Sequence, residues 1–274
     1  MIPKVIHYCW FGRNPKSEII QKCIESWKEF CPDYEIIEWN EDNFDVNVIG
    51  YTRDAYADEK YAFVSDYARL YVIFTQGGIY LDTDVLLHNS LDDLLKWDCW
   101  LASDDVRWIN TGMGFGAVKN HPLIKSVMQA YHTRSFPADF CTKLDTPVFE
   151  REMPELKKSY ENQIINNVLI LGKRGYPKYA RHFQTNTGQF FCEEQIREHA
   201  TKITAWMNGE RKDTISEKFR WKCRDIVRSP ELVNYIEKNR GKKRSWILTF
   251  LFYDLWDCGP WYFIKRVYKK IIVK

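Results

Sequence analysis

Gly77-Gly78-Ile79-Tyr80-Leu81-Asp82-Thr83-Asp84 is the stretch of sequence that decides the fold. The two glycines favour the end of a helix, and the apolar residues after them predict a short strand that ends in two carboxylates. On an extended segment Asp82 and Asp84 have the same parity, so both are predicted to project from one side of the backbone. Ligands of open α/β sheets gather at the C-terminal ends of strands. The stretch therefore predicts an α/β fold with a site at a strand end.

A second block, Ser-Asp-Tyr-Ala-Arg at residues 65–69, lies on a segment expected to form a helix over residues 58–76. Asp66 and Arg69 are three residues apart and therefore share a helical face. Arg suits phosphate or a sugar hydroxyl, and Asp suits a diol. Two hard oxygen ligands, Asp82 and Asp84, suit a divalent cation that holds a diphosphate. An isolated Asp-x-Asp is usually a solvated turn, but these flanks predict a nucleotide-sugar site.

The pattern of apolar residues predicts several further elements around this site. We expect strands over residues 4–10, 34–39, 99–102 and 114–118, and helices over residues 18–30, from Ser90 and from His121 onward. The opening strand–helix–strand unit indicates a parallel sheet with right-handed crossovers.

Several ordered blocks of the chain resemble one known family. These blocks are residues 2–12, 31–35, 39–42, 65–69, 77–84, 110–112 and 114–117. The chain resembles the Asp-x-Asp sugar-binding glycosyltransferases, which include yeast initiating α-1,6-mannosyltransferases and bacterial capsule and O-antigen enzymes, with the clostridial glucosylating toxins as distant relatives. The resemblance is dense over roughly the first 120 residues. It implies a GT-A-like nucleotide-binding fold with a central, mainly parallel sheet.

The resemblance also implies roles for the acidic residues and their neighbours. Asp84 is the expected direct metal ligand, and Asp82 is expected to contact the ribose or a metal-bound water, with Mn²⁺ or Mg²⁺ as the metal. The family's Ser-Asp-x-x-Arg block holds the donor sugar's hydroxyls and phosphate, which assigns that role to Asp66 and Arg69. Asp82, Asp84 and Arg69 are the expected catalytic set.

Three further residues are expected to bind the donor. Trp10, at the end of the first strand, resembles the family's base-stacking Trp, and its alternative is a plain core Trp. Tyr80 is expected to contact the sugar or phosphate, or else to be an ordinary inward-facing strand aromatic. Asn110 is expected to hydrogen-bond the donor sugar. His7, on the first buried strand, is interpreted as a core histidine whose hydrogen bonds are satisfied.

The match to the family fails on the C-terminal side of the site. Family members carry a His-His stretch followed by Ser-Trp, which closes over the diphosphate and completes the metal shell. One alignment makes Thr204 and Trp206 the counterparts of the Ser-Trp pair, with His199 displaced. Another aligns Ala205 and Trp206 with the His pair. His199 is the expected third metal ligand and Trp206 an expected donor contact.

Bulk composition limits the class of protein. The 274 residues, 45% apolar and 28% charged, suffice for one large soluble domain with a small appendage. The eight cysteines form no Cys-x-x-Cys pair, which argues against zinc. The N-terminus shows no signal-peptide pattern and no apolar run reaches about 18 residues, so we expect reduced thiols in a cytoplasmic protein.

The C-terminal part differs in kind. We expect a catalytic domain over residues 1–228 and a helical, basic, amphipathic tail over residues 229–274. Residues 240–274 hold nine Lys or Arg and two Asp, a net charge of +7, while the whole chain is +3. Such a segment fits the surface of an anionic membrane; the alternative is a helix packed on the core with a solvated face. Its apolar stripe argues against nucleic acid.

The resemblance, together with the basic tail, implies a metal-dependent, retaining glycosyltransferase at the inner face of the cell membrane. Its expected donor is a UDP-sugar such as UDP-galactose, and its expected acceptor a lipid-linked oligosaccharide in capsule or O-antigen biosynthesis. One alternative is a nucleotide-sugar-binding protein that has lost turnover. Another is a haloacid-dehalogenase-like phosphatase, because residues 81–85 also fit that family's Asp-x-Asp-x-Val signature.

Overall fold

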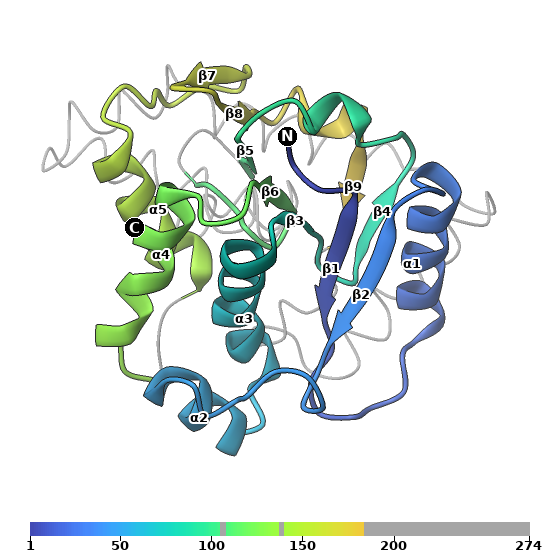
Figure 1. Ribbon diagram of the computed structural model, residues 1–274, viewed down its shortest axis with the longest axis vertical. Coiled ribbons are helices and arrows are strands. Elements are labelled where there is room, and N and C mark those ends of the chain that lie inside the picture. Colours follow the sequence, from blue (N-terminus) through green and yellow to red (C-terminus); the bar gives the residue numbers. More distant parts are fainter. Residues whose placement is uncertain (105–107, 137–139, 184–274) are drawn as a thin grey trace, which may run out of the picture. The chain divides into compact units, whose positions relative to one another are not determined.

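The computed structural model describes residues 1–104, 108–136 and 140–183 (Figure 1). The strands are β1 (Val5–Cys9), β2 (Glu35–Trp39), β3 (Gly78–Tyr80), β4 (Val85–Leu87), β5 (Cys99–Ala102), β6 (Phe115–Ala117), β7 (Gln163–Ile165), β8 (Val168–Leu171) and β9 (Ala180–His182). The helices are α1 (Glu18–Phe30), α2 (Gly50–Ala57), α3 (Tyr61–Gln76), α4 (Pro122–Ala130) and α5 (Cys141–Glu152). Three short 3₁₀ turns are η1 (Asp92–Leu94), η2 (Tyr131–Thr133) and η3 (Tyr176–Lys178).

Seven strands form one sheet in the order β2-β1-β3-β6-β5-β8-β7. The β1·β2, β1·β3 and β5·β8 pairs are parallel, whereas β6 runs antiparallel to both of its neighbours and β7 antiparallel to β8. Five strands therefore share one direction. This confirms the predicted mixed α/β architecture with a mainly parallel sheet, and it fits the GT-A-like fold that the resemblance implies.

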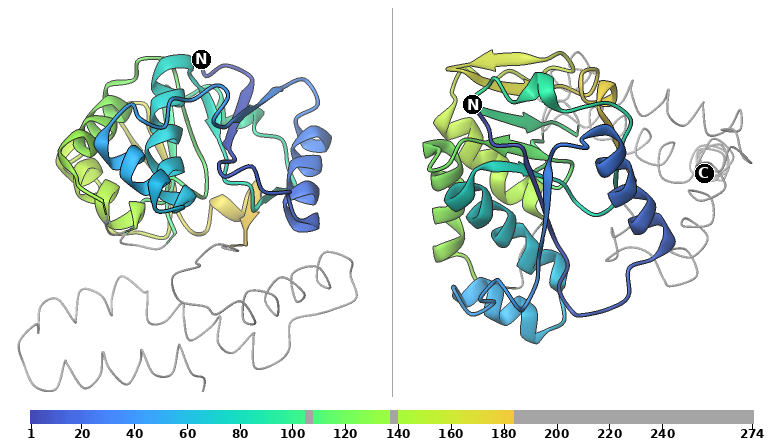
Figure 2. Two further views of the ribbon diagram at one scale, coloured as in Figure 1. Left: turned by 90° about the horizontal axis from the view of Figure 1, so that it is seen from below. Right: turned by 45° about the vertical axis from the view of Figure 1, so that its right-hand side comes forward.

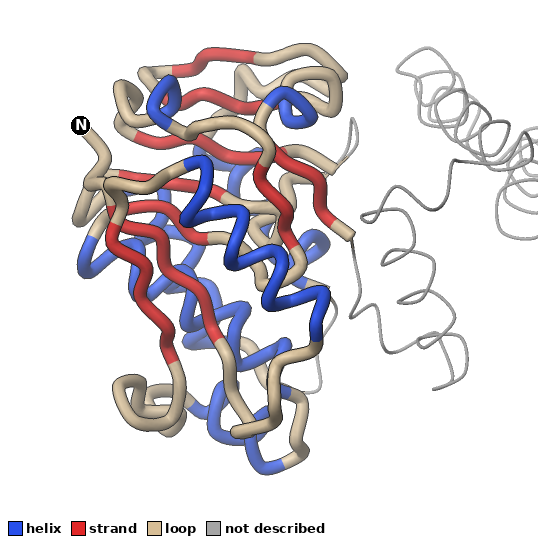
Figure 3. Tube along the Cα trace, turned by 90° about the vertical axis from the view of Figure 1, so that its right-hand side faces the viewer, coloured by secondary structure: helices blue, strands red, loops and turns tan. Residues whose placement is uncertain are grey.

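The sheet is covered on both faces, because successive side chains of each strand alternate between two cores. Leu101 and Phe115 belong to the core that contains the apolar face of α3, while Trp100 and Ile79 belong to the core that contains Trp27 of α1. Figure 2 shows α2 to α5 on one side of the sheet and α1 on the other. Figure 3, seen from the α1 side, shows α1 in front of the strands.

A separate two-stranded antiparallel sheet, β4 with β9, lies beside α1 and pairs Val85 with His182. Two side chains of α1 hydrogen-bond the backbone of β4: Trp27 Nε1 donates to Val85 O at 2.7 Å, and Ser26 Oγ accepts from Leu87 N at 3.0 Å. These bonds fix β4 against α1.

Several predicted elements are confirmed and some are wrong. The helix over residues 18–30 and the strand over residues 99–102 have the predicted bounds. His121 caps α4 through Nδ1, which accepts from Leu123 N. The helix predicted from Ser90 is wrong: only the 3₁₀ turn η1 forms, although Ser90 Oγ does accept from Asp92 N. The helix predicted over residues 58–76 begins at Tyr61, after the separate helix α2.

Five cysteines lie in the described residues, and all of them are free thiols. Among the described helices, none is both long enough and apolar enough to cross a membrane.

Candidate functional site

Asp82 and Asp84 lie in a turn that joins β3 to β4, where Val85 N donates to Asp82 O at 3.0 Å. The prediction that strand parity places both acids on one side of an extended segment is therefore wrong. The turn brings the carboxylates together instead, because it reverses the chain between two strands that belong to different sheets. The predicted position at the C-terminal end of an inner strand is confirmed, since β3 ends at Tyr80.

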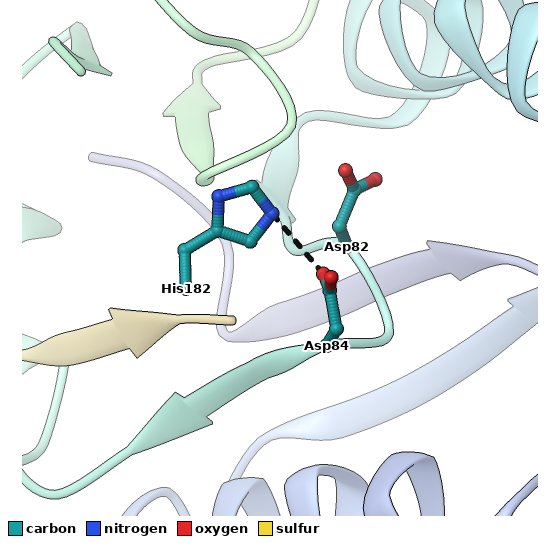
Figure 4. A group of neighbouring side chains, drawn as sticks. All are labelled: Asp82, Asp84 and His182. Atoms are coloured by element: carbon teal, nitrogen blue, oxygen red, sulfur yellow. Dashed lines mark ion pairs between the residues drawn. The ribbon is translucent and has the colours of Figure 1, made fainter. Parts of the chain in front are cut away.

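His182 completes a cluster with the two acids (Figure 4). One ligand atom from each of Asp82, Asp84 and His182 lies within 4.8 Å of the others, and His182 Nε2 is 3.1 Å from Asp84 Oδ1. Two carboxylate oxygens and one imidazole nitrogen form a donor set suited to Mn²⁺ and related cations. The described residues therefore fit the divalent cation that the resemblance implies.

The charges of the cluster support the same interpretation. Burial lowers the pKa of His182, but the negative charge of the adjacent Asp84 outweighs it and raises that pKa to about 9. Burial raises the pKa of Asp82, and repulsion from Asp84 raises it further against the attraction of Arg69. The two acids thus favour the protonated form of His182. The charge of that imidazolium occupies the place where a bound cation would put its own positive charge.

Arg69 and Asp66 come from adjacent turns of α3 and point toward Asp82. Arg69 Nη2 donates to Asp66 Oδ1 at 2.7 Å and lies 3.6 Å from Asp82 Oδ1. Tyr80 OH donates to the same Asp82 oxygen at 2.8 Å, and the Arg69 guanidinium lies 5.1 Å from the Tyr80 ring centroid. The structure thus brings together Asp66, Arg69, Tyr80 and Asp82, as the sequence predicted for a single site.

Within the described part of the chain, burial leaves one donor of Arg69 unsatisfied and raises the pKa of Asp66. Arg69 is only 3% exposed, and its Nη1 has no hydrogen-bond partner among the described residues. Burial raises the pKa of Asp66 to about 7, against the attraction of Arg69. A buried guanidinium nitrogen without a partner is costly. Arg69 therefore holds an unsatisfied donor that an anionic or hydroxyl-bearing ligand could satisfy.

Asn110 and Gly112 close the site from the loop before β6. Asn110 Oδ1 accepts from Gly112 N at 2.9 Å, which fixes the loop. A Cβ atom built on Gly112 would lie 2.5 Å from Asp82 Oδ2 and 3.1 Å from both Arg69 Nη1 and Asn110 Oδ1. The predicted residues Asn110, Asp82 and Arg69 therefore converge around one glycine that has no room for a side chain.

Trp10 directly follows β1, so its backbone leaves the sheet at the same edge as Asp82. Its ring is half-buried, its Nε1 donates to Asn14 O at 2.7 Å, and Lys16 Nζ lies 5.5 Å from the ring centroid. His7, in contrast, is a core residue. Its Nδ1 accepts from Trp39 Nε1, which can only donate, so its Nε2 carries the proton and donates to Gly77 O at 2.9 Å.

Two predicted site residues, His199 and Trp206, lie outside the described residues, as does the predicted basic tail. The sequence analysis missed His182, which occupies the position expected for a third metal ligand. Only its alternation with apolar Phe183 hinted at a strand, and nothing in the sequence paired that strand with residues 85–87. A contact between residues almost 100 positions apart leaves no pattern in the sequence around either of them.

Comparison with known proteins finds a family match over part of this site. Residues 17–104 match the family described as glycosyltransferase sugar-binding region containing DXD motif. Inositol phosphoceramide mannosyltransferase 3 of Schizosaccharomyces pombe is 31% identical over 140 residues, which cover 47% of this chain and 36% of that protein. Mannosyl phosphorylinositol ceramide synthase CSH1 of Saccharomyces cerevisiae is 27% identical over 195 residues, which cover 67% of this chain and 50% of that protein.

Two further similarities were found. Subversion of eukaryotic traffic protein A of Legionella pneumophila is 31% identical over 112 residues, 31% of this chain and 17% of that protein. The solved structure of the PaToxG glycosyltransferase aligns with 56% of this chain and 70% of its own, at a TM-score of 0.46 and 20% identity. The chain thus spans half or less of the length of these curated relatives.

The matched region contains the Asp82–Asp84 turn, the Asp66–Arg69 pair and the strand between them. The resemblance read from the sequence is confirmed: residues 17–104 match the family described as glycosyltransferase sugar-binding region containing DXD motif, and the chain is similar to glycosyltransferases of that kind.

Proposed function

We propose that this protein is a metal-dependent, retaining glycosyltransferase that moves a sugar from a nucleotide-sugar donor to an acceptor hydroxyl. The observation that carries the proposal is the convergence of Asp82, Asp84 and His182 beside Arg69, whose buried Nη1 has no partner among the described residues. A cation cluster and an unsatisfied guanidinium donor side by side suit a sugar diphosphate. The family match over residues 17–104 supports the same activity.

In this proposal Asp82, Asp84 and His182 would hold the cation, which would supply positive charge beside the diphosphate. Arg69 donates to the phosphate or a sugar hydroxyl, and Asp66 accepts from the sugar. Tyr80 OH and Arg69 fix the Asp82 carboxylate at 2.8 and 3.6 Å. The leaving diphosphate takes the acceptor's proton on the same face of the sugar, so catalysis is mainly positioning and electrostatics. His199 and Trp206 remain predicted contacts outside the described residues.

A UDP-sugar such as UDP-galactose remains the favoured donor, with a lipid-linked oligosaccharide of capsule or O-antigen assembly as acceptor. The names of two relatives describe mannosyl transfer onto inositol phosphoceramide, which supports a lipid acceptor and keeps mannose among the donors to test. Residues 241–274 are the proposed contact with an anionic membrane at its inner face. Deleting them should move the protein from the membrane fraction to the soluble fraction, and unchanged partitioning contradicts this part.

A second candidate is a protein that binds a nucleotide sugar without turnover. It is favoured by residues 199–209, which contain neither a His-His pair nor a Ser-Trp pair. Tight metal-dependent donor binding with no transfer to water or any acceptor would support it. The phosphatase alternative loses its support, because the family match accounts for the Asp-x-Asp stretch together with the helix before it.

The test is a panel of nucleotide sugars with and without Mn²⁺, read by thermal shift and by slow hydrolysis. Wild type, Asp84→Asn and a control, Glu25→Gln on the exposed face of α1, are compared. One donor should stabilise wild type and the control only with metal, and Asp84→Asn should lose that response. If no donor gives a metal-dependent response in wild type, the proposal is wrong.

A further inference from the structure

The stretch Trp39-Asn40-Glu41-Asp42 has no role in the proposed reaction, yet it contacts the chain around Trp10. Trp39, the last residue of β2, accepts through its O from Trp10 N at 2.8 Å, and its side chain donates to His7 of β1. These bonds extend the β1·β2 pairing to the first residue beyond β1. The stretch therefore adjoins residues 10–16, which we call the Trp10 loop.

The Trp10 loop has an unusual backbone. Gly12 has a φ of +88° and Arg13 a φ of +55°, so two successive residues lie in the left-handed region. This conformation suits glycine, but a residue with a long side chain such as Arg adopts it only rarely. Such a backbone persists where its surroundings fix it, so contacts outside the loop must determine its shape.

Glu41 supplies the main contact. Its Oε1 accepts from Gly12 N at 2.6 Å and from Tyr56 OH at 3.1 Å, while its Oε2 is shielded from solvent and has no hydrogen-bond partner among the described residues. Burial raises the pKa of Glu41, but the hydrogen bonds outweigh it and the pKa is lowered. The carboxylate thus stays ionised while it joins the loop to α2.

Neighbouring contacts hold the other side of the loop. Arg13 Nη2 lies 2.5 Å from Asp42 Oδ1, in an exposed ion pair that by itself contributes little. A Cβ atom on Gly12 would lie 2.3 Å from the ring of Tyr61, the first residue of α3. The glycine therefore packs directly on the aromatic ring. The loop is seated between Glu41 and Tyr61, with little freedom to shift.

The shape of the loop sets the orientation of the Trp10 ring. Trp10 Nε1 donates to Asn14 O, four residues further along the same loop, and Lys16 Nζ stands over the ring. A movement of the loop backbone at residues 12 and 13 would carry the Asn14 carbonyl and the ring with it.

We propose that Glu41 is a positioning residue for nucleotide binding, which holds the Trp10 loop so that the Trp10 ring is presented to the nucleobase. The inference rests on the proposed function, because it requires a nucleotide at Trp10. Glu41 touches the loop backbone and no reacting atom. Its loss should therefore weaken the contribution of the nucleobase to binding affinity and leave the contribution of the diphosphate unchanged.

Calorimetry on the full chain tests this with three titrants in Mn²⁺: UDP, GDP and inorganic diphosphate. Inorganic diphosphate uses the cation cluster but has no base. Glu41→Ala should weaken binding of the preferred nucleoside diphosphate about tenfold, the scale of one base–aromatic stack, and leave inorganic diphosphate within about twofold. Glu41→Gln, which keeps an oxygen acceptor for Gly12 N, should stay within about threefold. The control Asp33→Ala removes the Lys4 ion pair before β2 and should change neither affinity.

A double-mutant cycle with Trp10→Ala shows whether Glu41 acts through the ring. In the Trp10→Ala background, adding Glu41→Ala should weaken binding of the nucleoside diphosphate by less than about a further twofold. Additive losses, an equal loss of inorganic diphosphate, or a Glu41→Ala variant that binds like wild type would each overturn the inference and leave the proposed function intact. A wild type that binds neither nucleoside diphosphate contradicts the proposed function, and the inference falls with it.

Discussion

Gly112 illustrates how single residues determine the geometry of the site. Its Cα lies where Asp82, Arg69 and Asn110 meet, and a Cβ atom there would approach the Asp82 carboxylate to 2.5 Å. Because Asp82 is held by Tyr80 and Arg69, its carboxylate could move away only by giving up these contacts. A methyl group would therefore disturb the acid and the guanidinium together.

Gly112→Ala should reduce metal-dependent donor affinity at least about tenfold while changing the free energy of unfolding by about 1–3 kcal/mol, the usual cost of overpacking. Calorimetry and urea denaturation measure the two effects. Gly50→Ala is the matched control, because a Cβ atom at that helix start meets only the Arg53 side chain at 3.6 Å. Unchanged donor affinity in Gly112→Ala would show that the donor does not use this part of the site.

His182→Ala should weaken Mn²⁺ binding by at least about tenfold, because it removes the only nitrogen of the three-residue cluster. Electron paramagnetic resonance of free Mn²⁺ measures this without any substrate. His132→Ala, at an exposed histidine of η2, is the control and should bind like wild type. Equal Mn²⁺ affinity in both variants would exclude His182 as a ligand.

At the scale of elements, the site depends on how α1 holds β4. Asp82 follows a strand of the large sheet, whereas Asp84 directly precedes β4 and His182 is the last residue of β9 in the small sheet. The relative placement of the acids therefore depends on the docking of one sheet beside the other. Ser26 and Trp27 provide that docking through hydrogen bonds to Leu87 N and Val85 O.

Ser26→Ala should lower the free energy of unfolding by about 1–3 kcal/mol, because it leaves the buried N–H of Leu87 without its partner. Urea denaturation measures the loss, and Mn²⁺ affinity should fall with it. Ser90→Ala, which removes an exposed hydroxyl acceptor, is the control and should lower the free energy of unfolding by less than Ser26→Ala does. A Ser26→Ala variant as stable as wild type would mean that water or a neighbouring group replaces the hydroxyl.

At the scale of the whole molecule, His7 couples stability to pH. It joins β1 to Trp39 of β2 and to Gly77 at the end of α3. Burial lowers its pKa from 6.5 to about 4. Between these values the unfolded chain binds a proton at His7 that the folded chain excludes. The stabilisation is therefore fully present above pH 6.5 and is lost as the pH falls toward 4.

Urea denaturation between pH 4 and 7.5 should show this loss, about 3 kcal/mol from His7 alone. His7→Phe should be less stable at every pH, since it lacks both hydrogen bonds, but its stability should depend less on pH over this range. Identical slopes in wild type and His7→Phe would show that folding does not lower the pKa of His7.

The limits of sequence reasoning follow from the range of the interactions. Asp66 and Arg69 could be paired from their spacing, because three residues on a helix always share a face. The parity argument expected Asp82 and Asp84 side by side, and their carboxylates do lie close together. Its reason was wrong, since the two acids lie in a turn and not on a strand. His182 escaped prediction because its strand pairs with residues almost 100 positions earlier.

The sequence by itself determined the family resemblance, through its ordered blocks, and the mainly parallel α/β sheet, because apolar periodicity and short-range spacing encode helices, strands and their faces. It also named most of the residues that surround the proposed donor site. Only the tertiary structure decided which histidine stands beside the two acids, how Glu41 reaches the Trp10 loop, and why Gly112 can carry no side chain. Each of these depends on where separate elements pack, and packing is set by the whole core and not by neighbours in the chain.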